Sequence, residues 1–281
     1  MNYDKVVILG AGGQVGRELS QLYPGAKSFF HKSEGADIID LSKQDEIKKK
    51  ILEVKPKIII NAAALANVDL CEKDKPLSYS VNGLSLFTIT KIARKLDASL
   101  YHISTDYVFD GSEGNYSERS IPNPINYYGF SKLIGDTFAL SYEKSAIIRT
   151  SGVFGHSNNF PIFVINTLKG NKQVNAIKGY YSPIHAKILA MAIRDLVDSN
   201  FYGMINVASD KISRYEFATR LADRFNLDRN LINEVESPVN MFAKRPFDSS
   251  LDISLAKKIL GYDFHSIDVN LDALASSLSE T

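Results

Sequence analysis

One stretch near the start of the chain sets the expected architecture: Val6-Val7-Ile8-Leu9-Gly10-Ala11-Gly12-Gly13-Gln14-Val15-Gly16-Arg17-Glu18-Leu19. The four apolar residues before the first glycine predict a buried strand, and the spacing of apolar residues over 14–22 predicts a helix. A glycine turn between them lets the backbone approach a phosphate, and the helix end offers free N–H groups. The glycines recur at every third position, which differs from G-x-G-x-x-G, and no Gly-Lys-Ser/Thr follows as in a P-loop. The stretch therefore predicts a nucleotide-binding turn.

The same alternation of strand and helix continues through the first half of the chain. Apolar runs predict strands over 57–60, 100–104 and 146–149, and helical patterns lie over 45–54, 76–96 and 128–142. Repeated strand–helix–strand units favour an α/β fold with a Rossmann-type doubly wound parallel sheet. Ligands bind beyond the carboxyl ends of such strands, so three segments are candidates for the site: Asn61–Ala64, Ser104–Asp106 and Thr150–Gly152.

The second half of the chain has a looser pattern. Helices are expected over 160–169, 184–197 and 214–225, and a strand over 204–207 is expected to return to the sheet. We therefore expect an NAD(P)-binding Rossmann domain over 1–155 and, over 156–281, mainly a smaller C-terminal substrate-binding lobe. The segment 109–126, rich in Gly, Ser, Asn and Pro, predicts a long loop over the site.

A tyrosine and a lysine four residues apart, Tyr128 and Lys132, are the candidate proton-transfer pair. One helical turn places the two side chains on the same face. A free phenol has a pKa of about 10, and a nearby cation would lower it toward the range useful for acid–base chemistry. Tyr127 lies five residues from Lys132, roughly 140° round the helix, and is the worse partner. The alternative is an ordinary amphipathic helix start.

The end of the second predicted strand bears on the choice of cofactor. NAD sites usually place an acidic residue there for the ribose hydroxyls, whereas this chain has His31, Lys32 and Ser33. A cation and a hydroxyl suit a 2′-phosphate, so NADP(H) is preferred and NAD(H) is possible; alternatively, Lys32 is a solvated loop charge. Asp40 and Leu41 either flank the adenine, or Asp40 caps a helix that begins near residue 42.

Composition limits the other functional classes. The formal net charge of +1 over 281 residues opposes a general nucleic-acid role. The single cysteine, Cys71, excludes an intrachain disulfide and is expected to be structural in a reducing, cytoplasmic compartment. No signal peptide, membrane-spanning segment or metal site is expected, because the chain enters a strand at once, lacks a long apolar run and has scattered histidines.

Four motifs in order resemble the extended short-chain dehydrogenase/reductase superfamily, and most closely its dTDP-4-dehydrorhamnose reductase family. They are Gly10-x-x-Gly13-x-x-Gly16, Asn61-Ala62-Ala63-Ala64, Ser104-Thr105-Asp106-Tyr107-Val108-Phe109-Asp110-Gly111 and Tyr128-Gly129-Phe130-Ser131-Lys132. Weaker similarities extend the resemblance over nearly the whole chain, at Asn67-Val68-Asp69, Arg149-Thr150-Ser151, Ser182-Pro183 and Arg245-Pro246.

The resemblance implies NADP(H)-dependent reduction of the 4-keto group of a deoxysugar nucleotide, as in dTDP-L-rhamnose biosynthesis, with a homodimer by family analogy. Tyr128 would donate the proton, Lys132 would support it and contact the ribose, and Thr105 would orient the keto oxygen, although a strand-end hydrogen bond would also explain a threonine there. The expected cofactor contacts are Gly10, Gly12, Gly13, Gln14, Val15, His31, Lys32, Asp40, Leu41, Asn61, Ala62, Ala63, Ala64, Tyr128 and Lys132. The expected substrate contacts are Val68, Ser104, Asp106, Gly152 and Arg245.

Departures from the family pattern keep other functions open. Dehydratases of the superfamily carry Thr-Asp-Glu, whereas Tyr107 follows Asp106 here, which disfavours dehydration and leaves Asp106 as structural or as a contact for a substrate hydroxyl. The family commonly has Trp where this chain has Gly152, so the substrate pocket is expected to differ. The alternatives are a reductase of another nucleotide sugar, or an NADP-binding regulatory subunit resembling that of methionine adenosyltransferase.

Overall fold

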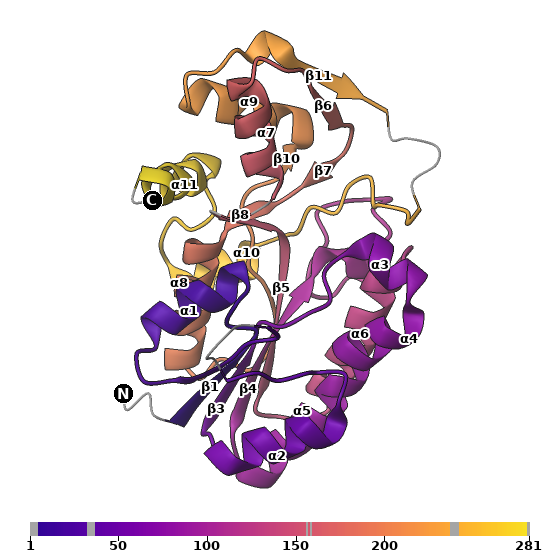
Figure 1. Ribbon diagram of the computed structural model, residues 1–281, viewed down its shortest axis with the longest axis vertical. Coiled ribbons are helices and arrows are strands. Elements are labelled where there is room, and N and C mark those ends of the chain that lie inside the picture. The colour runs from indigo at the N-terminus through magenta and orange to yellow at the C-terminus, as the bar shows by residue number, and fades with distance from the viewer. Residues whose placement is uncertain (1–4, 33–36, 156, 158, 237–241, 280–281) are drawn as a thin grey trace.

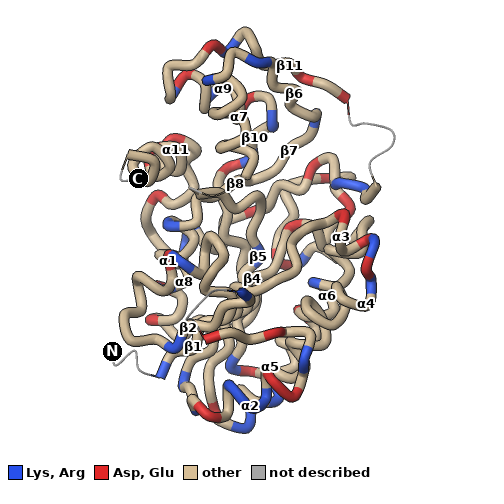
Figure 2. Tube along the Cα trace, in the orientation of Figure 1, with Lys and Arg blue, Asp and Glu red and all other residues tan. Residues whose placement is uncertain are grey.

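The computed structural model describes residues 5–32, 37–155, 157, 159–236 and 242–279 of the chain. They form a larger part built around one sheet and a smaller part above it (Figure 1). The described residues include no helix long and apolar enough to cross a membrane. Lys and Arg positions are interspersed with Asp and Glu positions over both parts (Figure 2).

The main sheet has seven strands, and all of its strand pairs are parallel. The order is β2-β1-β3-β4-β5-β8, and β9 also pairs with β5. This confirms the predicted α/β fold with a Rossmann-type parallel sheet. The strands are β1 Val6–Leu9, β2 Lys27–Phe29, β3 Ile58–Asn61, β4 Ser99–Thr105, β5 Ser145–Phe154, β8 Pro183–His185 and β9 Gly203–Asn206.

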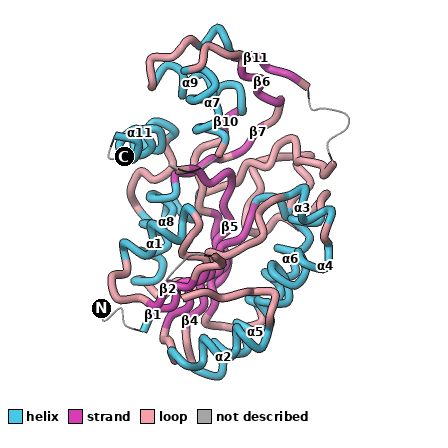
Figure 3. Tube along the Cα trace, in the orientation of Figure 1, coloured by secondary structure: helices cyan, strands magenta, loops and turns pink. Residues whose placement is uncertain are grey.

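Helices cover both faces of this sheet, with α1 and α8 on one side and α2, α5 and α6 on the other (Figures 1 and 3). Successive strand residues point to opposite faces, so Ile8 packs into the core beneath α1 and α8 while Leu9 packs into the core beneath α2 and α5. The helices are α1 Gln14–Leu22, α2 Gln44–Val54, α3 Val68–Lys73, α4 Lys75–Ser78, α5 Ser85–Leu96, α6 Tyr127–Leu140, α7 Phe160–Lys169, α8 Ala186–Asp198, α9 Arg214–Arg224, α10 Ser254–Leu260 and α11 Ile267–Ser279.

The long helix predicted over 76–96 is confirmed, since Lys75 to Leu96 are helical without a break. The structure adds a π-helical stretch over Tyr79–Leu84, between α4 and α5. Within the wide turn, the buried Asn82 side chain accepts from Leu65 N–H and donates to Ser131 Oγ on α6. Gly135 packs directly on this stretch, because a Cβ there would lie 2.4 Å from the Asn82 carbonyl oxygen. Local periodicity could not reveal these contacts with distant segments.

The smaller part holds two short sheets and its own core. Strand β6 Val174–Ile177 pairs with β11 Ile232–Val235, and β7 Tyr180–Tyr181 pairs with β10 Ile212–Ser213. Helices α7 and α9 cover these sheets (Figure 1), and the buried ring of Phe217 on α9 packs edge to face on the rings of Phe154 and Tyr181 in the core. The chain beyond residue 155 also returns to the main sheet, through β8, α8 and β9.

Strand β5 joins the two parts. Its first half pairs with β4 and β9. Its second half pairs with β8 at Ser151 and at Phe154, and the register shifts between these two residues. Gly152 lies at this break with a φ of +43°. The strand thereby carries the end of the main sheet into the smaller part, where Phe154 enters the second core.

Candidate functional site

The loops that follow β1 and β3 meet at the point where the strand order reverses. Gly10 has a φ of +83°, and a Cβ on it would lie 2.6 Å from the Ala63 backbone nitrogen. A Cβ on Gly16 would lie 2.1 Å from the Gly10 carbonyl oxygen. These two positions therefore require glycine for the close approach of backbone to backbone. Such a switch point is where ligands bind in open α/β sheets.

The N-terminus of α1 opens onto this point without a capping side chain. Gly13 is the N-cap, it makes no side-chain cap hydrogen bond, and the first turn contains no acidic residue. A helix end of this kind presents free N–H groups and a partial positive charge, which suits a phosphate. Gln14 braces the turn, since its Nε2 donates to Val153 O (3.4 Å) and its Oε1 accepts from Asn159 Nδ2 (3.0 Å).

A groove of about 430 Å³ lies in front of this helix end. A second cavity of about 240 Å³ adjoins it and shares Ala64 with it. Their size suits a ligand larger than a single nucleotide ring system. Among the residues predicted for the site, the groove is lined by Gly13, Gln14, Val15, Ala62, Ala64, Val68, Ser104, Thr105, Asp106, Tyr128, Lys132 and Gly152, and the second cavity by Gly10, His31, Asp40, Leu41, Ala63 and Ala64.

Three predicted cofactor contacts lie outside these two sets of lining residues. Gly12 is exposed on the outer side of the turn, and Lys32 is exposed next to His31. Asn61 is fully buried beneath the groove, where its Oδ1 accepts from Ala63 N–H (3.2 Å) and shapes the loop after β3. Ser33, the third residue of the predicted cofactor signal, lies outside the described residues.

Asp40 does not cap the following helix. Helix α2 begins at Gln44 with Lys43 as its N-cap. The Asp40 carboxylate instead accepts from the backbone N–H and the hydroxyl of Ser42, at 2.9 and 2.7 Å. These bonds close a turn that holds Asp40 and Leu41 against the second cavity, so the capping alternative is wrong.

Tyr128 and Thr105 meet in the groove. Asn126 caps α6 by accepting from Gly129 N–H (2.9 Å), and a Cβ on Gly129 would lie 1.9 Å from the Tyr107 carbonyl oxygen. This contact fixes the first turn of α6 against the end of β4, and the rings of Tyr107 and Tyr128 pack edge to face. The Tyr128 phenol is hydrogen-bonded to the Thr105 hydroxyl.

The pKa of the Tyr128 phenol is raised above its ordinary value. Loss of contact with water is the largest cause, and the Thr105 hydrogen bond opposes it. The expected lowering by Lys132 is not found, because the Lys132 Nζ is turned toward β4, where it donates to Ile103 O (2.8 Å) and lies 3.1 Å from His102 Nε2. The phenol is therefore protonated at neutral pH but is a weaker acid than a free tyrosine, so the raised pKa does not itself favour proton transfer.

Two predicted substrate contacts direct their polar atoms into the protein. Ser104 Oγ donates to Asp136 Oδ2 (2.8 Å), in the layer behind the groove. The buried Asp106 carboxylate accepts from Ser151 Oγ (2.6 Å) and Thr105 Oγ1 (3.1 Å). Asp106 thus holds the Thr105 side chain in place, and burial raises the pKa of its carboxyl.

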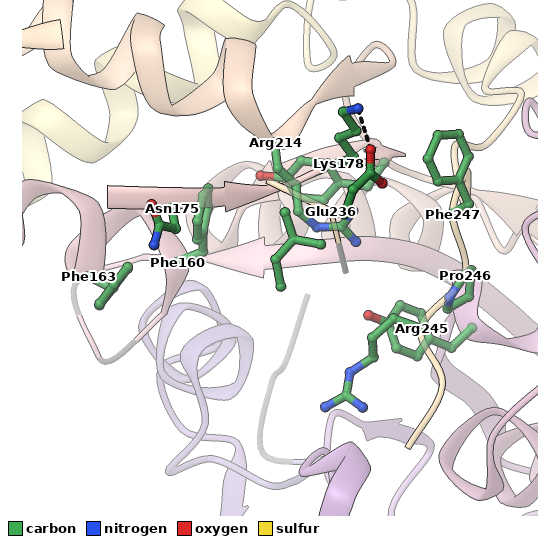
Figure 4. Close-up of a pocket in the computed structure, with 12 residues that line it drawn as sticks. Phe160, Phe163, Asn175, Lys178, Arg214, Glu236, Arg245, Pro246 and Phe247 are labelled. Atoms are coloured by element: carbon green, nitrogen blue, oxygen red, sulfur yellow. Dashed lines mark hydrogen bonds and ion pairs between the residues drawn. The ribbon is translucent and has the colours of Figure 1, made fainter. Parts of the chain in front are cut away.

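A third cavity, of about 510 Å³, lies between the two parts and shares Tyr107 with the groove. Figure 4 shows Phe160 and Phe163 on one side and Arg245, Pro246 and Phe247 on the other. Most of these residues come from the second half of the chain. Arg245 was predicted as a substrate contact, and Tyr107, Arg245 and Pro246 lay within quoted motifs. The other lining residues were not assigned from sequence, because they are far apart along the chain and follow no motif.

Arg214 is the central cation of this third cavity. Its guanidinium stacks over the Tyr181 ring (5.2 Å to the centroid) and is hydrogen-bonded to Tyr107. Lys178 is paired with Glu236, but no carboxylate among the described residues lies within ion-pair distance of Arg214. The arrangement offers a positive charge between aromatic walls, which suits an anionic ligand with a flat ring.

Two predicted substrate residues form the walls of the cavities. Arg245 lines the third cavity while both of its terminal nitrogens lie 3.0 Å from the carboxylate of Asp69 on α3. A Cβ on Gly152 would lie 2.7 Å from the Tyr181 ring, so Tyr181 occupies the space in which a side chain at position 152 would stand. Tyr181 is therefore the aromatic wall between the groove and the third cavity.

Comparisons with known proteins agree with this geometry. The family model described as RmlD substrate binding domain matches residues 4–279. The dTDP-4-dehydrorhamnose reductase of Aggregatibacter actinomycetemcomitans is 30% identical, with 92% of this chain and 93% of the relative covered. A structure titled as a hypothetical dTDP-4-dehydrorhamnose reductase from Sulfolobus tokodaii is 46% identical, with a TM-score of 0.90 and 96% and 98% coverage. The Bacillus anthracis dTDP-4-dehydrorhamnose reductase in complex with NADP is 28% identical, with a TM-score of 0.86 and 98% and 99% coverage.

Proposed function

The chain belongs to the dTDP-4-dehydrorhamnose reductase family, and from that premise we propose that it reduces the 4-keto group of dTDP-4-dehydrorhamnose with NADPH. One observation carries the proposal beyond family membership: the hydrogen-bonded pair of Tyr128 and Thr105 lines the same groove as the uncapped N-terminus of α1. A proton donor and a phosphate site share one cavity, as reduction by a dinucleotide requires.

The groove and the second cavity fit the cofactor. The glycine turn leaves backbone N–H groups free for the pyrophosphate, and Asp40 and Leu41 line the cavity that suits the adenine. His31 and Lys32 stand where NAD sites usually have an acidic residue, and they favour a 2′-phosphate, so NADP(H) is preferred. When bound, NADPH supplies the hydride for the keto carbon.

The chain's own residues supply the proton and the stabilisation of charge. Negative charge builds on the keto oxygen as the carbon is reduced, and the hydroxyls of Thr105 and Tyr128 are placed to bind that oxygen. Tyr128 donates its proton to the oxygen, which becomes the 4-hydroxyl, and the phenolate is reprotonated from water. In the structure Thr105 donates to the buried carboxylate of Asp106, so its proton would turn from Asp106 to the keto oxygen when the substrate binds.

The third cavity is the proposed site for the nucleotide of the substrate. Arg214 would pair with the diphosphate, and Phe160 or Phe163 would contact the base. On this proposal, residues 1–155 mainly hold the cofactor and residues after 155 mainly hold the substrate. The remaining parts of the proposal are a cytoplasmic location, supported by the buried free thiol of Cys71, and a homodimer by family analogy.

The experiment is a direct assay of purified protein with NADPH and dTDP-4-dehydrorhamnose, followed by the loss of absorbance of NADPH. We expect turnover with a preference for NADPH over NADH. Binding of NADPH without turnover would overturn the substrate assignment. The same assay with other 4-keto nucleotide sugars separates a different reductase from a regulatory subunit: turnover of one of them supports the former, and no turnover together with co-purification of a methionine adenosyltransferase supports the latter.

A further inference from the structure

One buried amide joins the first turn of α6, which carries Tyr128, to a wall of the third cavity. Asn126 is 6% exposed and is the N-cap of α6. Its Oδ1 accepts from Gly129 N–H (2.9 Å), and its Nδ2 donates to Lys244 O (2.9 Å). Both partners are backbone groups, an N–H and a C=O, so only one orientation of the amide satisfies them. The two bonds connect segments that lie more than 100 residues apart in the chain.

The wall in question is the segment 243–247, called the wall segment below. It is irregular, and it places Arg245, Pro246 and Phe247 along the third cavity (Figure 4). An irregular segment draws its hydrogen bonds from other parts of the chain. The position of this wall therefore depends on the residues that bond to it.

The ends of the wall segment are held by two other contacts. On the α3 side, the Asp69 carboxylate lies 3.0 Å from each terminal nitrogen of Arg245. At the other end, Tyr180 N–H donates to Phe247 O (2.7 Å). The bond from Asn126 lies between these two contacts, and Asn126 is the partner that is also bonded to the first turn of α6.

Helix α3 offers a second connection between the wall segment and α6. Besides Asp69 it carries Glu72, whose Oε2 accepts from Tyr127 N–H (2.8 Å) at the start of α6. Asn126 and Glu72 thus satisfy two of the N–H groups that a helix leaves free in its first turn. A movement of the wall segment can reach Tyr128 through Asn126 or through α3, and substitutions can separate the two routes.

We propose that Asn126 is a positioning residue for the reaction, because its amide fixes the wall segment and the first turn of α6 relative to each other. The proposal rests on the proposed function, in which the nucleotide of the substrate fills the third cavity and Tyr128 donates the proton. A nucleotide sugar bound against the wall segment is thereby placed at a defined position relative to the phenol. Loss of the bond to Lys244 would free the wall, and loss of the bond to Gly129 would free the helical turn.

The first test removes the bond to Lys244 alone. Serine is about as good an N-cap as asparagine, but its shorter side chain cannot span Gly129 N–H and Lys244 O together. In Asn126→Ser we expect KM for the nucleotide sugar to rise by about two- to tenfold. Both kcat and KM for NADPH should stay near their wild-type values, because the helix cap is kept.

Asn126→Ala removes both bonds. Here kcat should fall as well, by about 10- to 100-fold, because the turn that carries the proton donor is no longer held. The control is Asp228→Ala, which removes the cap of the short helix Arg229–Leu231 and should change neither constant. A merely structural role would not separate KM from kcat between the two Asn126 variants. An unchanged KM for the nucleotide sugar in Asn126→Ser would overturn the proposal.

A second test needs no substrate and no Asn126→Ala protein, which may fail to fold. Hydrogen exchange of the Gly129 amide is followed by NMR in the NADP⁺-bound protein. Asp69→Asn loosens the wall segment, so it should speed this exchange when Asn126 is present and have a smaller effect in Asn126→Ser. An equal effect in both backgrounds would mean that the connection runs through α3, and no effect in either would mean that there is none; each result would overturn the proposal.

Failure of the proposed function has a different signature. In that case the wild-type protein turns over no nucleotide sugar. The exchange of the Gly129 amide would still respond to Asp69→Asn more strongly with Asn126 than with serine at that position.

Discussion

The cofactor groove and the third cavity are built in opposite ways. The groove and the adjoining second cavity are formed mainly by short segments at strand ends, and backbone contacts such as that between Gly10 and Ala63 set the shape of these segments. The third cavity is formed by large aromatic and cationic side chains, among them Phe160, Tyr181 and Arg214, which come from separate segments.

This difference assigns different tasks to the two regions. A groove whose shape is set by the backbone tolerates few substitutions, and it suits the cofactor and the reaction, which do not vary with the substrate. A wall of side chains can be altered one residue at a time, and it suits the part of the substrate that sets specificity. Substitutions should therefore affect chemistry and cofactor in the groove, and substrate affinity in the third cavity.

The largest effect is expected from Tyr128→Phe. Loss of the proton donor should lower kcat by about 10²- to 10⁴-fold, while the affinity for NADPH, measured by fluorescence titration, changes little. Tyr127→Phe is the matched control, because Tyr127 packs on Phe130 and Lys75 outside the groove and should keep near wild-type activity. Retained turnover in Tyr128→Phe would remove Tyr128 from the mechanism.

Gly10→Val should damage the groove itself. The new Cβ would collide with Ala63, and the φ of +83° is strained for any branched side chain. We expect the free energy of unfolding to fall by about 1 to 3 kcal/mol and NADPH binding to weaken sharply. Gly261→Val imposes a similar φ of +70° with no atom within 4 Å of the Cβ, so it should lower stability but leave NADPH affinity intact. Equal NADPH affinities in the two variants would contradict the groove assignment.

Arg214→Met should separate the third cavity from the groove. Loss of a charge-assisted contact to the diphosphate should raise KM for the nucleotide sugar by about 10- to 100-fold, with KM for NADPH unchanged. The control is Arg220→Met on the same helix, since Arg220 is exposed and pairs with Glu216. An equal rise in both KM values would show that the two regions are not independent.

The smallest effect is expected at the edge of the second cavity. Lys32→Glu should raise KM for NADPH by about two- to thirtyfold, because an exposed charge contributes only about 0.2 to 1 kcal/mol and its reversal about doubles that. KM for NADH should stay the same. Lys49→Glu, an exposed charge on α2, controls for the change in net charge. Equal changes with both cofactors would leave Lys32 as a solvated loop residue.

The sequence predicted the groove far better than the third cavity. Strand, glycine turn and helix follow one another within 17 residues, so local spacing determines how Gly10, Gly13 and the start of α1 meet. The spacing of Tyr128 and Lys132 likewise placed both residues on one helix face that lines the groove. It could not give the direction of the Lys132 Nζ, which is set by His102 and Ile103, about 30 residues earlier.

The third cavity required information that no local pattern holds. Arg214 begins an ordinary amphipathic helix, and only the tertiary fold brings it over Tyr181 and beside Tyr107. The sequence did identify Gly152 as unusual. It could not show that Tyr181, 29 residues later, fills the space beside it, because that contact depends on the register break in β5.

Strand β5 also couples the unfolding of the larger and the smaller part of the molecule. Ile148 packs in the main core and Phe154 in the second core, six residues along the same extended segment. Because β5 contributes side chains to both cores, unfolding of one core would remove hydrogen bonds and packing from the other. The two parts are therefore expected to unfold together. The smaller part is thus not a separate cooperative unit, and heat or denaturant should disrupt substrate and cofactor sites in one step.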